Sequence, residues 1–289
     1  MKRTLGNSSN IFRGLAILSV LLLAAAVFTA HSASAAEKDS LAAIKAAGKI
    51  RIGVYADEPP FGYIDKKGKN AGFDLVIARR VAKDLLGGEN KVEWVPLNPA
   101  DRVEYLETNK VDIVFANFTV TKERAERVDF ALPYMKAALG LVSKNGQVIK
   151  DIAELKGKKL IIVKGSTAEK YLAYNYPDVE LLKFEDMSEA LQALAGGRGA
   201  ALSNDNTLLF AWANANPGYT VGIPSFGSPD TIAPAVRKGN KELLRWLNDE
   251  LKKLGGERFM HKAYKEALEP FYGGAVDPES VVVEGGVVK

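Results

Sequence analysis

Residues 115–124 read FANFTVTKER, and the rest of the chain is predicted to be built to present this segment. An apolar strand predicted over residues 111–115 passes through Asn117 and Thr119 and becomes a charged helix that carries Arg124. The first turn of such a helix leaves N–H groups free, and the helix dipole favours negative charge, so anions bind there. Arg124 lies one turn into the helix, where its planar guanidinium could grip a carboxylate with two parallel hydrogen bonds. Alternatively, Arg124 is a solvated charge that pairs with a neighbouring glutamate.

The chain before this stretch alternates strands and helices. Strands are expected at residues 51–56, 61–65 and 91–97, and helices at residues 40–47, 72–86 and 101–109. The order favours a mostly parallel sheet covered by helices on both faces. In such sheets ligands bind outside the carboxyl ends of the strands. The candidate binding loops are therefore residues 57–61, 98–102 and 117–124.

The chain after this stretch predicts a second, smaller α/β unit. Residues 130–143 have an extended pattern that favours a crossover strand leaving the first lobe, and a return crossover is expected at residues 219–225 and 231–236. Between them, strands are expected at residues 160–164, 179–184 and 200–203, and helices at residues 168–176, 188–195 and 207–215. Two crossings between two lobes create a hinge with a cleft. The predicted large lobe comprises residues 40–132 and 230–273, the small lobe residues 136–226, and the C-terminal tail residues 274–289.

The first 35 of the 289 residues differ in composition from the remainder. Lys2, Arg3 and Arg13 precede an apolar run over residues 15–30, which is too short for a convincing membrane span. The small residues that follow, ending at Ala35, are typical of a signal-peptidase site. Residues 1–35 are therefore predicted to be a secretory signal peptide. The alternative is an uncleaved N-terminal anchor.

Charge and residue counts exclude several functions. Without the three basic residues of the signal peptide, 36 lysines and arginines stand against 35 acids, so no basic surface suggests nucleic acid as a partner. The chain has no cysteine, hence neither disulfides nor a lipobox for acylation. His261 is the one histidine that survives signal removal, which argues against a zinc site or a histidine-based triad. We expect a soluble periplasmic protein with no metal and no cofactor.

Five segments in colinear order carry a family resemblance. They are PPFGY at residues 59–63, GFDLVIARRVAKDLLG at 72–87, ANFTVTKERAERVDF at 116–130, VKGST at 163–167 and ALSNDN at 201–206. Over residues 41–271 the chain resembles the periplasmic amino-acid-binding proteins of ABC transporters, solute-binding protein family 3. The resemblance implies the type II periplasmic-binding-protein fold, in which two α/β domains joined by two crossover strands enclose a ligand cleft.

A narrower resemblance concerns the ligand. The segments at residues 100–119, 197–212, 231–246 and 281–286 are similar to those of the family's cysteine receptors. Some of those relatives are lipoproteins, whereas this chain lacks the acylation cysteine, which leaves any membrane tethering open.

A receptor for an α-amino acid must offset the desolvation of both ligand charges. The resemblance implies that Arg124 binds the α-carboxylate and that Thr119 adds its N–H and hydroxyl group. It also implies that the Asn117 carbonyl accepts from the α-ammonium, with which Asp205 pairs. Asp205 could instead cap the next helix.

The second lobe and the strand tips supply the remaining candidates. Ser166 and Thr167 begin a predicted helix, so their N–H groups could close on the same carboxylate, or they could simply cap the helix. Arg102 favours a thiol, carboxylate or amide on the ligand, unless it is a solvated residue paired with a nearby acid. The remaining candidates are Phe61 and Tyr134, as pocket walls or as core, and Glu58 with Asp57, facing ligand or solvent.

Three functional hypotheses follow. The first is a monomeric, non-enzymatic receptor that binds a free L-amino acid and delivers it to an ABC permease in the inner membrane. Cysteine is the first candidate ligand, and aspartate, glutamate or another small polar amino acid are the alternatives. The second is a cyclohexadienyl dehydratase-like enzyme that uses Asp57 or Glu58 as its acid. The third is an exported sensory or antigenic interaction protein.

Overall fold

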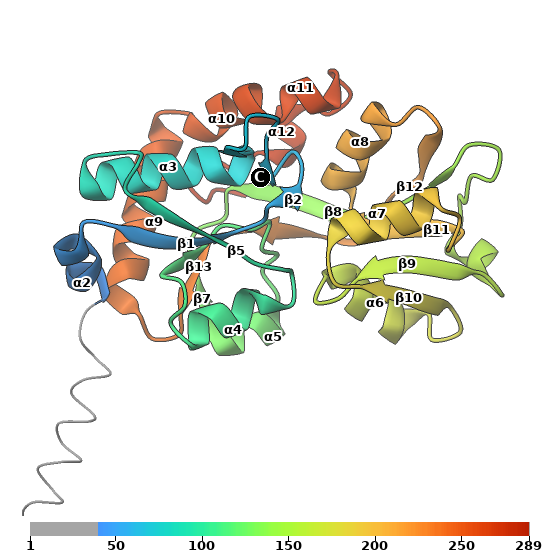
Figure 1. Ribbon diagram of the computed structural model, residues 1–289, viewed down its shortest axis with the longest axis horizontal. Helices are drawn as coiled ribbons and strands as arrows, with labels where there is room; N and C mark the ends of the chain where they lie inside the picture. Colours follow the sequence, from blue (N-terminus) through green and yellow to red (C-terminus); the bar gives the residue numbers. More distant parts are fainter. Residues whose placement is uncertain (1–39, 289) are drawn as a thin grey trace, which may run out of the picture.

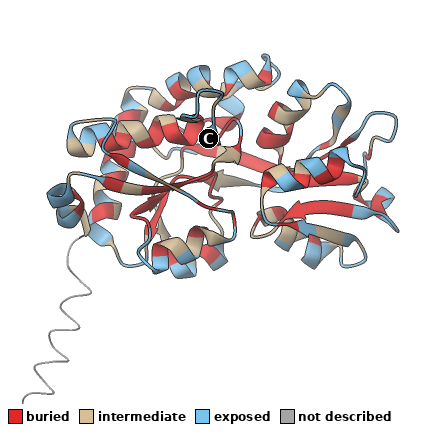
Figure 2. Ribbon diagram, in the orientation of Figure 1, coloured by how far each residue is buried: buried red, intermediate tan, exposed pale blue. Residues whose placement is uncertain are grey.

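The computed structural model describes residues 40–288, so the predicted signal peptide lies outside the described residues. Two α/β lobes lie side by side and are joined by long strands (Figure 1). Burial is concentrated on the sheets and on the helix faces that cover them (Figure 2). None of the helices within residues 40–288 is both long and apolar enough to cross a membrane.

The large lobe is built on a five-stranded sheet with the order β5-β1-β6-β13-β7. Strands β5, β1 and β6 are parallel, whereas β13 runs antiparallel to β6 and β7. A small antiparallel sheet, β2-β3-β4, adjoins it. The strands are β1 (Ile50–Val54), β2 (Asp57–Glu58), β3 (Gly62–Ile64), β4 (Asn70–Ala71), β5 (Val92–Pro96), β6 (Ile113–Val114), β7 (Val128–Phe130) and β13 (Ala235–Arg237).

Helices cover both faces of this sheet, as its parallel strands predict (Figure 1). Helix α3 packs on one face against the C-terminal helices, and α4 contacts the other face. The helices are α2 (Ser40–Ala47), α3 (Phe73–Leu86), α4 (Asp101–Glu107), α5 (Lys122–Arg127), α9 (Lys241–Gly256), α10 (Phe259–Ala267), α11 (Glu269–Tyr272) and α12 (Pro278–Val281).

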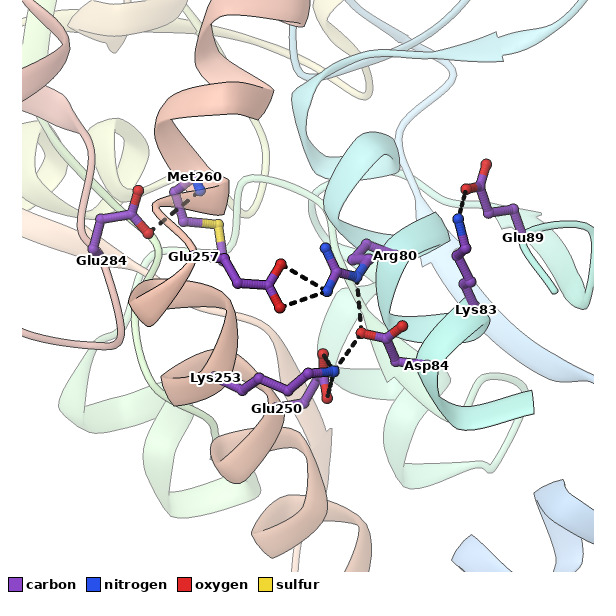
Figure 3. Close-up of polar contacts among 9 residues, drawn as sticks. All are labelled: Arg80, Lys83, Asp84, Glu89, Glu250, Lys253, Glu257, Met260 and Glu284. Carbon is purple, nitrogen blue, oxygen red and sulfur yellow. Dashed lines mark hydrogen bonds and ion pairs between the residues drawn. The ribbon is translucent and has the colours of Figure 1, made fainter. Parts of the chain in front are cut away.

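An ion-pair network joins α3 to α9 on the outer side of the large lobe (Figure 3). Arg80 binds Asp84 through Nε and Glu257 through Nη2, both at 2.8 Å. Lys253 pairs with Asp84 at 2.8 Å and with Glu250 at 3.3 Å. The network therefore attaches α3, which precedes the first crossover strand, to α9, which follows the return crossover.

The small lobe has the sheet order β10-β9-β11-β8-β12. Strands β9, β10 and β11 are parallel, the crossover strand β8 runs antiparallel to β11, and the return crossover β12 pairs antiparallel with β8 at the edge of the sheet. The elements are β8 (Met135–Lys144), the 3-10 helix η1 (Ile152–Leu155), β9 (Lys159–Val163), α6 (Thr167–Asn175), β10 (Glu180–Phe184), α7 (Met187–Ala195), β11 (Ala201–Asp205), α8 (Asn206–Ala215) and β12 (Tyr219–Ile232).

The C-terminal tail returns to the start of the first crossover. Val282 forms an antiparallel bridge with Met135, and the Val283 N–H donates to the Tyr134 carbonyl at 2.9 Å. The strand-like composition of residues 281–283 therefore yields a single bridge after the short helix α12. Because Met135 begins β8, the tail holds one end of a connection between the lobes.

Candidate functional site

A cavity of about 10 Å³ lies where the two lobes meet. The large lobe supplies the ends of β1, β2 and β6 and the loop before α4, and the small lobe supplies the β9–α6 turn and the end of β11. The lining residues are Tyr55, Glu58, Pro99, Arg102, Asn117, Thr119, Ser166, Thr167, Asn204 and Asp205. The cavity is thus at the carboxyl ends of parallel strands, where the sequence placed the candidate binding loops.

Arg124, on α5, does not line this cavity but a second one of about 360 Å³, which shares Thr167 with the first. The Thr121 side chain caps the helix by accepting from the Arg124 N–H, and the Arg124 side chain turns inward, leaving the residue 6% exposed. Its Nη1 donates to the Thr119 carbonyl at 2.7 Å, and its Nη2 donates across the interface to the Gly165 carbonyl at 2.8 Å. These bonds use two of the five guanidinium N–H donors. The solvated alternative for Arg124 is therefore wrong.

Burial makes the Arg124 cation costly. Desolvation, followed by the neighbouring Arg102 cation, lowers the pKa of Arg124 to about 9. Its hydrogen-bonded partners among residues 40–288 are carbonyl oxygens, which carry no formal charge. A guanidinium in this situation gains more from an anion than an exposed one does, because the low-dielectric surroundings strengthen the pairing.

Arg102, at the start of α4, is more fully bonded. Its Nε donates to the Pro99 carbonyl at 2.9 Å, and Nη1 donates to the Ala116 and Asn117 carbonyls, both at 3.1 Å. Its Nη2 donates to the Gly165 carbonyl at 3.1 Å, so four of the five donors are used. Arg102 is 3% exposed, which overturns the alternative of a solvated helix-start residue.

Asn117 and Asp205 meet across the lobe interface. The Asn117 Nδ2 donates to Asp205 Oδ2 at 3.0 Å, while the buried Asn117 Oδ1 has no partner among the described residues. The Asn117 carbonyl, expected to serve the ligand ammonium, accepts from Arg102. Burial raises the pKa of Asp205 to about 6, against the lowering effects of Arg102 and Arg124. An ammonium group would favour the charged form of Asp205.

Asp74 supports the site from behind, and the sequence reasoning missed it. Its carboxylate accepts from the Asn117 N–H at 2.7 Å and from the Tyr134 hydroxyl at 2.7 Å. Burial raises the pKa of Asp74 to about 6. The carboxylate thereby fixes the turn at Asn117, whose φ of 42° is in the left-handed region. An acid inside the apolar GFDLV segment was the available signal.

Besides Arg124, two further candidates are not in the cavity lining. Phe61 and Tyr134 are both fully buried in the core of the large lobe, where Tyr134 packs against Phe73 and Phe115. The expectation that they form pocket walls is therefore corrected to the core alternative. Large aromatic side chains that follow a strand are usually buried in the core beside it.

Ser166, Thr167 and Glu58 do line the cavity. Ser166 is also the N-cap of α6, since its Oγ accepts from the Glu169 N–H at 3.1 Å. Glu58 is 3% exposed, and its pKa is well above the usual range, mainly through burial and then through Asp57. Asp57 lies at the rim, where its Oδ2 accepts from the Ser188 N–H of the small lobe at 3.1 Å.

The arrangement places opposite charges at one lobe interface. Arg124, with unused N–H donors, and Asp205, with a destabilised carboxylate, are close enough for each to shift the other's pKa. Tyr55, Pro99 and Asn204 also line the cavity and were not among the candidates. The chemistry of this set suits a small molecule that carries both a carboxylate and an ammonium group.

Comparisons with known proteins show the family and the fold of the chain. The bacterial extracellular solute-binding proteins, family 3, match residues 50–269. The chain is 36% identical over 261 residues to the ABC transporter glutamine-binding protein GlnH of Bacillus subtilis, covering 88% of this chain and 95% of that one. It is also similar to the solved structure of a solute receptor for L-cysteine of Neisseria gonorrhoeae, with 51% identity, a TM-score of 0.83 and coverage of 84% of this chain and 99% of that one.

A second solved structure, the cysteine-binding protein of Campylobacter jejuni, is 50% identical, with a TM-score of 0.84 over 85% of this chain and 99% of that one. The expected fold is confirmed: two α/β lobes in the type II periplasmic-binding-protein arrangement. The chain belongs to the bacterial extracellular solute-binding proteins, family 3.

Proposed function

We propose that this protein is the extracytoplasmic receptor of an amino-acid ABC importer and that it binds a small polar L-amino acid, cysteine before others. The observation that carries the proposal is the buried Arg124 guanidinium with unused donors, at the same lobe interface as the Asp205 carboxylate. The ligand α-carboxylate would take the Arg124 donors, and its α-ammonium would pair with Asp205. Both buried charges of the protein would then be compensated.

The other lining groups complete the ligand's hydrogen bonds. Thr119 contributes from the large lobe, and Ser166 and Thr167 contribute from the first turn of α6, where N–H groups and the helix dipole favour a carboxylate. The unpartnered Asn117 Oδ1 is a second acceptor for the ammonium. These residues would bind the α-carboxylate and the α-ammonium of the ligand. Tyr55, Glu58 and Asn204 would then face the ligand side chain.

Cysteine is supported by the two solved cysteine receptors, which share about half of their residues with this chain. Arg102 was the reason to consider an anionic side chain, but four of its donors are already bonded to carbonyl groups. Aspartate and glutamate consequently rank below neutral ligands of cysteine's size.

The transport role follows from the lobes. A ligand that binds residues of both lobes stabilises their closed arrangement by its differential affinity, and a membrane permease can recognise that arrangement. We propose a periplasmic location and a monomeric state for the mature protein.

Isothermal titration tests the proposal. Protein freed of bound ligand by unfolding and refolding is titrated with each of the twenty amino acids, with cysteine kept reduced and cystine included as a control. We expect the tightest binding for cysteine, with a dissociation constant in the micromolar range, about −8 kcal/mol, or below. The absence of heat with every amino acid would show that the proposed function is wrong.

One observation favours an enzymatic alternative. Glu58 is a buried acid in the cavity with a raised pKa, which is the condition for a general acid at neutral pH. A dehydratase-like elimination of water from prephenate or arogenate would use it. Turnover of either compound by the wild-type protein, lost in Glu58→Gln, would support the enzyme over the receptor.

A further inference from the structure

Gly165 occupies the point where the backbone of the small lobe touches the large lobe. It lies in the turn between β9 and α6 and has a left-handed φ of +73°. Its N–H donates to Glu169 Oε2 at 2.8 Å, which ties the turn to α6 of its own lobe. Its carbonyl oxygen faces the other way, into the interface.

The Gly165 carbonyl accepts from both buried arginines of the large lobe. Arg124 Nη2 lies 2.8 Å from this oxygen and Arg102 Nη2 lies 3.1 Å from it. Both guanidiniums also lie over the Phe118 ring, at 5.0 and 4.6 Å from its centroid. One small-lobe oxygen therefore accepts from both cations, and it can do so only while the lobes are together.

The approach requires the absence of a side chain at position 165. A Cβ built there would lie 2.6 Å from the Ala100 Cα, 2.7 Å from the Ala100 nitrogen and 3.0 Å from the Pro99 carbonyl carbon. All three contacts are with backbone atoms of the large lobe, so no side-chain rotation can relieve them. By contrast, Gly157, with a φ of +74° in the same lobe, has open space where its Cβ would be.

We propose that Gly165 is the positioning residue that couples lobe closure to ligand affinity: its missing side chain admits the loop at Ala100, and its carbonyl then orients Arg124. The inference rests on the proposed function for the identity of the bound carboxylate. In the separated lobes Arg124 keeps its large-lobe contacts, the bond to Thr119 and the Phe118 ring, but its Nη2 loses the acceptor that orients it. The closed arrangement therefore binds the carboxylate more tightly, which is the differential affinity that drives closure.

The matched substitutions Gly165→Ala and Gly157→Ala separate this role from backbone strain. Both place alanine at nearly the same left-handed φ, so both lose a similar increment of thermal stability. Only Gly165→Ala forces atoms of the two lobes apart. We expect Gly157→Ala to bind the wild type's preferred amino acid within about twofold, and Gly165→Ala to lose about tenfold or more in affinity.

Small-angle scattering supplies a readout that does not depend on titration. We expect the wild type and Gly157→Ala to reach a smaller radius of gyration at saturating ligand than Gly165→Ala does. Equal affinities for the two variants, or equal losses in both, would overturn the role of Gly165. If an alanine variant does not fold, as judged by circular dichroism, Gly165→Asn and Gly157→Asn repeat the comparison with a residue that tolerates the left-handed region.

The two proposals fail in different ways. If the wild type binds none of the twenty amino acids, the proposed function is wrong, and scattering without ligand then decides the inference. In that case, a larger radius of gyration for Gly165→Ala than for Gly157→Ala supports the role of Gly165. Identical scattering profiles for the two variants overturn it. If the wild type binds and the two variants remain indistinguishable, only the inference fails.

Discussion

At the level of single residues, the two arginines that lie over the Phe118 ring differ in how many hydrogen-bond donors they have left for a ligand. Arg102 and Arg124 both lie over Phe118, and the proximity of Arg102 contributes to the lowered pKa of Arg124. Arg102 gives four donors to carbonyl oxygens and thereby holds the turn that follows β6. Arg124 gives two. The hydrogen-bonding capacity left for a ligand is therefore concentrated on Arg124, although both side chains are buried.

The substitution Arg124→Lys tests this division. A lysine ammonium cannot bind the Thr119 and Gly165 carbonyls and also a carboxylate in bidentate fashion. We expect amino-acid affinity to fall by about 2–5 kcal/mol, roughly 30-fold or more, in isothermal titration. Arg127→Lys is the control on the same helix, because Arg127 is exposed and pairs with Glu107. Affinity within threefold of the wild type for Arg124→Lys would contradict the assignment.

Asp205 makes the affinity depend on pH. Its pKa in the free protein is raised to about 6 by burial, and an α-ammonium would lower that pKa by stabilising the carboxylate. Below about pH 6 the free protein holds a proton that binding must release, so affinity falls as the pH drops and levels off above pH 7. Asp74, whose pKa is also raised to about 6, is bonded to Asn117 and Tyr134 and does not line the cavity.

Calorimetry checks the proton release directly. At pH 5.5, titrations in two buffers of different ionisation enthalpy should differ in observed heat by the protons released, and the difference should vanish at pH 8. Asp205→Asn should bind more weakly and without the pH dependence. An affinity that is constant from pH 5 to pH 8 would exclude Asp205 as the partner of the ammonium.

At the scale of elements, periodic segments were predictable and short ones were not. The apolar spacing in residues 72–86 predicted a helix that the structure places at Phe73–Leu86. The strand expected over residues 111–115 is reduced to Ile113–Val114, although the Phe115 N–H still donates to the Gly53 carbonyl beyond the assigned ladder. Boundaries of this kind depend on the partner strand, which the local sequence does not contain.

Long-range contacts within the site escaped the sequence for the same reason. Arg124, Asp205 and Thr119 stand out locally because polar residues follow apolar strands there. The bond from Tyr134 to Asp74 joins residues 60 positions apart, and neither residue has a local pattern that names the other. Pairings between elements follow from the packing of the whole lobe, so a strand end predicts a candidate but not its supporting partner.

The N-terminus of α10 offers a prediction at this scale. Arg258 at the N-cap provides no side-chain cap, and the tail residue Glu284 instead accepts from the His261 N–H at 2.9 Å and the Met260 N–H at 3.3 Å. Glu284→Ala should lower the free energy of unfolding by about 1–2 kcal/mol in urea denaturation, because these N–H groups lose their acceptor.

Glu279→Ala is the control for that variant. Glu279 also contacts His261, through Nε2 at 2.9 Å, but its side chain is 63% exposed and accepts no backbone N–H of α10 in the structure. We expect a change within about 0.5 kcal/mol. Equal losses in the two variants would show that the contact with the His261 ring, rather than the capping of α10, is what stabilises the tail.

At the scale of the whole molecule, the lobes meet at two rims on either side of the cavity. At one rim the half-buried Asp57 accepts from the N–H of Ser188 in the first turn of α7. At the other, Glu123 of α5 forms an ion pair with Lys170 of α6, and both side chains are largely exposed. Neither contact can persist when the lobes separate, so each adds to the free energy of the closed arrangement by an amount set by its solvent exposure.

The rims should therefore differ in their effect on ligand release. Asp57→Ala leaves a small-lobe N–H without its charged acceptor, and we expect an affinity loss of about 1.5 kcal/mol, roughly tenfold, expressed mainly as faster dissociation. Lys170→Ala removes a screened surface pair and should change the dissociation rate by less than about threefold, with the difference disappearing at high salt. Stopped-flow tryptophan fluorescence during ligand displacement measures both rates. A larger acceleration in Lys170→Ala than in Asp57→Ala would mean that the exposed pair, and not the bond to α7, holds the lobes together.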